Sequence, residues 1–113
     1  MKTITKKEAK EFNTKISSLV VKNGFILNEL GYYQKDTNYG KVDIHILEPS
    51  SSLFSVCCRF ENVTKASKMF QCSHNGKYNF HFSKGDGVIE YIFGQIKYFM
   101  DELNGEIFEE GLV

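Results

Sequence analysis

The 113-residue chain has no tryptophan, a single proline, a single arginine and no long apolar run. A membrane-spanning helix needs roughly 18 or more consecutive apolar residues, so no membrane span is expected. Residues 1–12 are charged and lack the apolar core and small-residue cleavage site of a secretory signal. These absences exclude a membrane protein and predict a cytoplasmic location.

Cysteine is also scarce. The three cysteines are an odd number and follow no signal, which argues against a disulfide framework. Structural zinc sites use paired ligand knuckles, and adjacent Cys57 and Cys58 on a strand point to opposite faces. We therefore expect no metal and no cofactor. A zinc site, or a thiol nucleophile at Cys72 with His74 or His81, is kept as a third class of hypothesis.

What is present describes one ordinary globular domain. Hydrophobic residues make up 42% of the chain and aromatics 14%, and the formal net charge is zero. The balance hides an asymmetry: residues 1–85 hold 13 basic and 7 acidic groups, whereas residues 86–113 hold 1 and 7. We expect a single domain over residues 1–105 and an acidic tail over 106–113. The tail either presents an interaction surface of one sign or neutralises the basic body.

Three helices are predicted from apolar spacing and capping signals. Residues 6–22 carry an amphipathic stripe after Thr5, which forms a capping box with Glu8. Residues 87–103 repeat apolar positions at helical spacing, with Asp86 as the expected N-cap. A short helix over 63–70 is expected to begin at an Asn62 cap.

The segments between the helices alternate with a period of two residues, as strands do. The expected strands cover 25–34 (interrupted at Gly31), 41–48, 53–60 and 77–82. They predict an α+β two-layer sandwich in the order α-β-β-β-α-β-α. An antiparallel sheet of about four strands carries the N- and C-terminal helices on one face. Alternation in the last strand separates an aromatic set from a polar set, and the aromatic set is the natural core face: Tyr78, Phe80, Phe82 against Lys77, Asn79, His81.

No constellation for catalysis is present, because the chain has neither a phosphate-binding glycine loop nor a G-x-S-x-G elbow. We therefore expect a protein that is not an enzyme. A nucleic-acid-binding function is the alternative hypothesis, since residues 62–85 contain lysines and aromatics but no acid. Its candidate residues are Lys65, Lys68, Lys77, Asn79, His81 and Lys84.

A protein-binding surface is the leading hypothesis. Tyr32, Tyr33 and Tyr39 cluster around the first expected hairpin, and exposed tyrosine is typical of protein interfaces. The tail adds acidic and apolar residues that either pack on their own domain or bind a partner or a second subunit. The tail residues assigned to this surface are Glu106, Phe108, Glu109 and Glu110.

Two short stretches resemble small uncharacterised phage and prophage proteins. Arg59-Phe60-Glu61-Asn62 through Ala66, followed by Gly76-Lys77-Tyr78-Asn79-Phe80-His81, is similar to their R-F-x-[DN]-x-x-x-A and G-K-[WY]-N-[FH]-H stretches. The resemblance covers roughly residues 37–82, and His74-Asn75 departs from its pattern. It implies no particular activity. It implies a mobile-element origin and a partner among host proteins, such as a component of a defence system.

Overall fold

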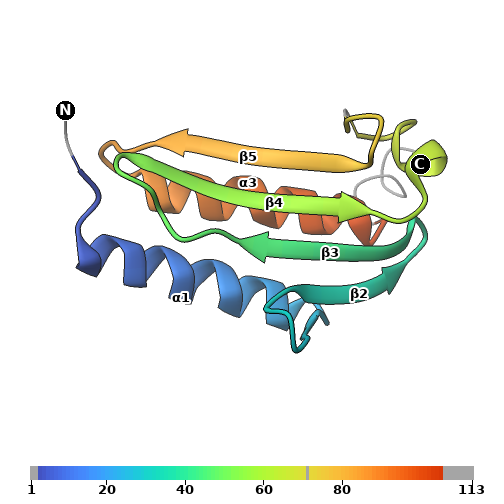
Figure 1. Ribbon diagram of the computed structural model, residues 1–113, viewed down its shortest axis with the longest axis horizontal. Coiled ribbons are helices and arrows are strands. Elements are labelled where there is room, and N and C mark those ends of the chain that lie inside the picture. The colour runs from blue at the N-terminus through green and yellow to red at the C-terminus, as the bar shows by residue number, and fades with distance from the viewer. Residues whose placement is uncertain (1–2, 71, 106–113) are drawn as a thin grey trace.

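A computed structural model describes residues 3–70 and 72–105. Two long helices, α1 (Lys6–Lys22) and α3 (Val88–Leu103), pack against each other and against one face of an antiparallel sheet (Figure 1). The predicted two-layer α+β sandwich with both helices on one side is confirmed. Within these residues, no helix has the length and apolarity needed to span a membrane.

The sheet has five strands rather than the four expected, and they follow one another in chain order. The additional strand arises because the segment expected at 25–34 is divided at Gly31, which adopts a φ of +88°. The Asn28 side chain accepts hydrogen bonds from the backbone N–H groups of Leu30 and Tyr32, which fixes the turn. The strands are β1 (Ile26–Leu27), β2 (Tyr33–Thr37), β3 (Gly40–Ile46), β4 (Leu53–Phe60) and β5 (Lys77–Ser83).

The helix ends agree with the sequence at two points and differ at two. The capping box of Thr5 and Glu8 is present, and the Asn62 side chain accepts from Lys65 N–H. The helix that Asn62 caps, α2 (Val63–Ala66), is shorter than expected. The prediction that Asp86 caps the last helix is wrong. The N-cap of α3 is Gly87, whose φ of +69° brings the chain into the helix without a side-chain cap.

The core lies between the sheet and the helices and is rich in aromatic rings. Phe99 of α3 is its centre, with ring centroids of Phe70, Phe80 and Tyr78 at 5.2, 5.3 and 5.4 Å. Tyr78 and Phe80 project from β5 towards α3, as the alternation favoured. The polar residues of β5 consequently lie on the other face of the sheet, which no helix covers.

Candidate functional site

The uncovered side of the sheet, called here the open face, carries mostly polar and charged side chains. It consists of the outward-pointing residues of β2 to β5. Its central row crosses four strands in direct register, because Gln34 pairs with Asp43, Asp43 with Arg59, and Arg59 with Lys77. Two adjoining hollows cover this face and share Asp43, Arg59 and Lys77.

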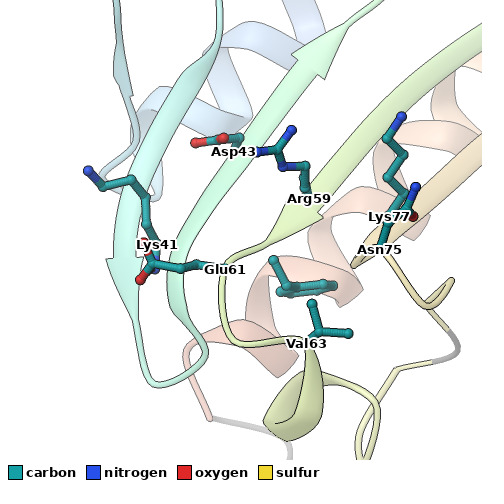
Figure 2. A pocket seen from close by; sticks show the side chains of 8 residues that line it. Lys41, Asp43, Arg59, Glu61, Val63, Asn75 and Lys77 are labelled. Atoms are coloured by element: carbon teal, nitrogen blue, oxygen red, sulfur yellow. Dashed lines mark hydrogen bonds between the residues drawn. The ribbon is translucent and has the colours of Figure 1, made fainter.

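Arg59 and Lys77 form the cationic end of the central row. Gln34 Nε2 donates to Asp43 Oδ1 at 2.8 Å. Figure 2 shows the Asp43 carboxylate turned away from the Arg59 guanidinium. Among residues 3–70 and 72–105, neither Arg59 nor Lys77 takes part in an ion pair. Two exposed cations therefore lie directly opposite each other on adjacent strands. Such a pair of like charges lowers the stability of the sheet.

The first hollow also contains carboxylates, so the open face is not uniformly basic. Lys41 lies opposite Asp36 on β2, and its backbone N–H donates to Glu61 Oε1 at 3.3 Å. Figure 2 shows Lys41 and Glu61 at one side of this hollow and Lys77 at the other. Both signs of charge are thus present on the face, with the carboxylates on the β2–β3 side and Arg59 and Lys77 on the β4–β5 side.

The second hollow is lined mostly by hydrogen-bonding side chains, together with Tyr32 and the apolar side chains of Leu30 and Leu47. The Tyr32 ring meets the His45 ring edge to face, with centroids 4.8 Å apart. His45 lies opposite Cys57, and Ser55 Oγ is 2.8 Å from His81 Nδ1. Neutral donors and acceptors here surround the charged central row.

The three tyrosines assigned to a protein-binding surface do not come together. Tyr32 lies on the open face. Tyr33 is in register with buried Ile44 and packs against the core. Tyr39 packs its ring on Phe60 and Phe70, and burial, followed by the charge of Glu102, raises its pKa. The four tail residues of the same hypothesis, Glu106, Phe108, Glu109 and Glu110, lie outside the described residues.

The residues assigned to nucleic-acid binding are divided among three places. Lys77, Asn79 and His81 share the open face. Lys65 and Lys68 line a separate groove beside α2. Lys84 does not belong to either group, because its Nζ lies 2.7 Å from Glu8 Oε1 and 2.9 Å from the Thr3 carbonyl oxygen.

Arg59 and His45 are open-face residues that the sequence hypotheses omitted. The alternation over 53–60 placed Arg59 opposite the core set, which was the available signal. The cross-strand register then decides that Arg59 adjoins Lys77. The register between β4 and β5 could not be predicted from the sequence, because α2 and a loop separate Arg59 from Lys77 along the chain.

The cysteines do not converge on one site. Cys58 is buried, and desolvation, with smaller contributions from Cys57, Asp43 and Cys72, raises the pKa of its thiol well above the usual range. Cys57 lies on the open face, and Cys72 Sγ is 3.3 Å from Ser67 Oγ. Within the described ranges, no group of three or more His, Cys, Asp or Glu residues could hold a metal ion.

No protein-family model, curated protein or solved structure matches the chain.

Proposed function

We propose that the protein is a non-enzymatic binding protein and that the open face of its sheet contacts a partner protein. The observation that carries the proposal is the central row, in which Arg59, the only arginine of the chain, lies between Asp43 and Lys77. Arginine and tyrosine are enriched among the residues that contribute most to protein association. Tyr32 supplies an aromatic side chain on the same face.

The mixture of charges supports a protein partner over a uniform polyanion. Lys41, Arg59 and Lys77 are interspersed with carboxylates on the same face and in its hollows. Such a pattern favours a partner surface with both signs of charge at complementary positions, and it penalises partners with like charges there. The resemblance to phage and prophage proteins supports a host protein as the partner, including a component of a defence system, in the host cytoplasm.

The test is capture of partners from a host lysate by the immobilised full-length protein, followed by measurement of the purified pair. Arg59→Ala should weaken the affinity for the captured partner by about 2 kcal/mol, roughly thirty-fold, as truncation of a central arginine does. Isothermal titration calorimetry gives both affinities.

Lys10→Ala is the matched control, because Lys10 is an exposed cation on α1, away from the open face. Its affinity should equal that of the unmodified chain. The proposal fails if the captured partner binds the Arg59 variant and the unmodified chain equally well. It also fails if the protein captures nothing at physiological salt.

Binding of single-stranded nucleic acid is the second candidate function. The β4–β5 half of the open face supports it, since its outward residues include Arg59, Lys77, Asn79 and His81 and no acid. Cations there would contact phosphates. The aromatics of β5 do not support base stacking, because they face the core.

Fluorescence anisotropy of labelled single strands across a salt series separates the two candidates. Each phosphate contact contributes about −0.7 to the slope of log affinity against log salt for single strands. Lys77→Ala should make that slope shallower by about 0.7, and Lys10→Ala should leave it unchanged. A salt-independent signal, or no binding at low salt, excludes this second function.

A further inference from the structure

The sheet ends on one side at β5, and within residues 3–70 and 72–105 β4 is the only strand that pairs with it. β5 keeps an unbroken register with β4 over its seven residues and contains no proline. Natural proteins protect a free strand edge with prolines, bulges, short strands or lysines, because such an edge pairs with other strands. The one lysine of β5, Lys77, is its first residue. The middle of this edge therefore lacks the usual protection.

The hydrogen bonds between β4 and β5 decide which backbone groups of β5 point outward. On one side of the strand, the Phe60 N–H donates to the Gly76 carbonyl oxygen at 2.9 Å. On the other side, the Lys84 N–H donates to the Ser52 carbonyl oxygen at 2.8 Å. Hydrogen-bonded pairs recur at every second residue of an antiparallel ladder. The even-numbered residues of β5 therefore bond to β4, and the odd-numbered residues direct their N–H and C=O groups away from it.

Three of the four odd-numbered residues are available for pairing. Lys77 is engaged, because its N–H donates to Ser73 Oγ at 3.2 Å and its carbonyl oxygen accepts from the Ser73 N–H at 2.9 Å. The others are Asn79, His81 and Ser83, all of them exposed. Their outward N–H and C=O groups are called here the β5 edge.

Two exposed tyrosines of α3 accompany the β5 edge on the helix-covered side of the sheet. Tyr91 meets the Phe82 ring of β5 edge to face, with centroids 5.6 Å apart, and is still 58% exposed. Tyr98 lies about two turns further along the same face of α3 and is 54% exposed. α3 itself runs behind β4 and leaves the outer side of β5 open (Figure 1). Aromatic side chains are enriched at protein interfaces, so these tyrosines add a side-chain surface to the backbone groups.

We propose that the β5 edge pairs with the β5 edge of a second copy of this chain, as antiparallel strands related by a two-fold axis. A pairing centred on His81 bonds every available group, because Asn79 then pairs with Ser83 of the second copy and His81 with its own counterpart. A centre one residue away would need the groups of Lys77, which Ser73 engages, or would leave Asn79 without a strand residue opposite.

The side chains suit the same register. Lys77 lies opposite Gly85 of the second copy, so the lysines of the two strands do not meet. On the helix-covered side, Phe80 lies opposite Phe82 of the second copy, and aromatic cross-strand pairs stabilise a sheet. The two α3 helices run antiparallel across the axis, which directs Tyr91 of one copy towards Tyr98 of the other.

Backbone groups, charge and aromatic rings are thus satisfied by one axis, which favours a second copy over a strand of another protein. The axis is perpendicular to the sheet, so the helices of both copies lie on one side and the two open faces join on the other. This association goes beyond the proposed function and does not depend on it.

Sedimentation equilibrium of the full-length protein measures the association. We expect a monomer–dimer equilibrium with a limit at twice the mass of one chain. Tyr98→Lys places a cation at the aromatic part of the interface and should raise the dissociation constant at least about tenfold. Leu30→Lys is the matched control, because Leu30 is 80% exposed and lies between β1 and β2, at the other edge of the sheet. Its dissociation constant should equal that of the unmodified chain.

Three results of this measurement would overturn the proposal. One is a protein that stays monomeric up to about 1 mM. Another is a dimer whose dissociation constant Tyr98→Lys leaves unchanged. The third is association beyond two chains, because a two-fold pairing of edges is closed.

Amide hydrogen exchange followed by NMR tests the strand edge itself. The Asn79 and His81 amides should exchange about tenfold more slowly in the dimer than in the monomeric Tyr98→Lys variant. The Leu27 amide is the control at the opposite edge. It points away from β2, because the neighbouring Asn28 N–H bonds to the Tyr32 carbonyl oxygen. Its exchange should be fast in both proteins.

Fast exchange of Asn79 and His81 in a dimer would place the interface elsewhere and overturn the proposal. Slow exchange that persists in the monomeric variant would overturn it too, because the edge would then be covered within one chain.

Discussion

The Lys35 ammonium is hydrogen-bonded to the Asn104 side chain at 3.0 Å, although 69 residues separate them. The same Nζ donates to the Asn23 carbonyl oxygen at 2.7 Å, and Asn104 Nδ2 donates to Asn23 Oδ1 at 3.2 Å. Asn23 and Asn104 are the C-caps of α1 and α3. One cation from the helix-side face of β2 therefore lies at the negative ends of both helix dipoles.

Removal of this cation should destabilise the fold. Lys35→Met keeps the aliphatic part of the side chain but leaves the Asn23 and Asn104 acceptors without their charged donor. We expect a loss of about 1.5–3 kcal/mol in the free energy of unfolding, the usual range for hydrogen bonds to charged groups. Urea denaturation measures it. Lys41→Met, an exposed lysine of the open face, should change the free energy by less than about 0.5 kcal/mol. Equal losses in both variants would contradict the assigned role.

A second long-range contact gives the protein a specific sensitivity to acid. The hydrogen bond from Lys84, followed by the bonds from Thr5, lowers the pKa of Glu8 from 4.5 to about 2. A carboxyl whose pKa is lower in the folded state stabilises the fold above its unfolded pKa. This contribution is therefore complete above about pH 4.5 and is lost as the pH falls towards 2.

Urea unfolding at a series of pH values checks this contribution. Glu8→Gln should flatten the fall in stability between about pH 4.5 and 2 relative to the unmodified chain. Glu11→Gln, on the same helix and exposed, is the control and should keep the full dependence. Identical pH profiles for Glu8→Gln and the unmodified chain would exclude the Glu8–Lys84 contact as their source.

The juxtaposition of Arg59 and Lys77 predicts a trade-off between stability and binding. Like charges directly opposite on adjacent strands destabilise a sheet by about 0.2–1 kcal/mol. Lys77→Gln should accordingly raise the free energy of unfolding by that amount while it weakens binding through the open face. Thermal unfolding and titration with the captured partner give the two quantities. A variant that is less stable than the unmodified chain would show that Lys77 has an attractive partner.

Replacement of glycine by alanine should have opposite effects on stability at Gly76 and at Gly94. At Gly76, with φ at +79°, a Cβ atom would lie 2.6 Å from the Phe60 carbonyl oxygen, so alanine clashes with backbone. Gly76→Ala should cost more than about 1–2 kcal/mol, the price of the left-handed conformation alone. Gly94 lies in α3 with nothing within 4 Å of a Cβ, so Gly94→Ala should stabilise by about 0.5–1 kcal/mol. Chemical denaturation of both variants checks the opposite signs.

The long elements were predictable because their signals are local. The helix over 6–22 and the strand over 53–60 match their predicted bounds. In each, the regular spacing of apolar residues continues from one end of the element to the other. The helix over 63–70 was predicted too long. Only Val63–Ala66 is α-helical, and apolar spacing over so short a segment does not determine how far a helix extends. The Asp86 cap failed because Gly87 reaches a positive φ that alters the entry of the chain into α3.

The sequence by itself determined that this is a two-layer α+β domain and that Tyr78, Phe80 and Phe82 lie on the face opposite Lys77, Asn79 and His81. Periodicity of two or 3.6 residues is a local property, and burial of the apolar set follows from it. Only the tertiary structure decided which polar residues meet. Strand register placed Arg59 beside Lys77. Packing against the core separated Tyr33 and Tyr39 from Tyr32, and a long-range contact paired Lys84 with Glu8. These outcomes depend on chain segments distant in sequence, whose relative positions no local pattern encodes.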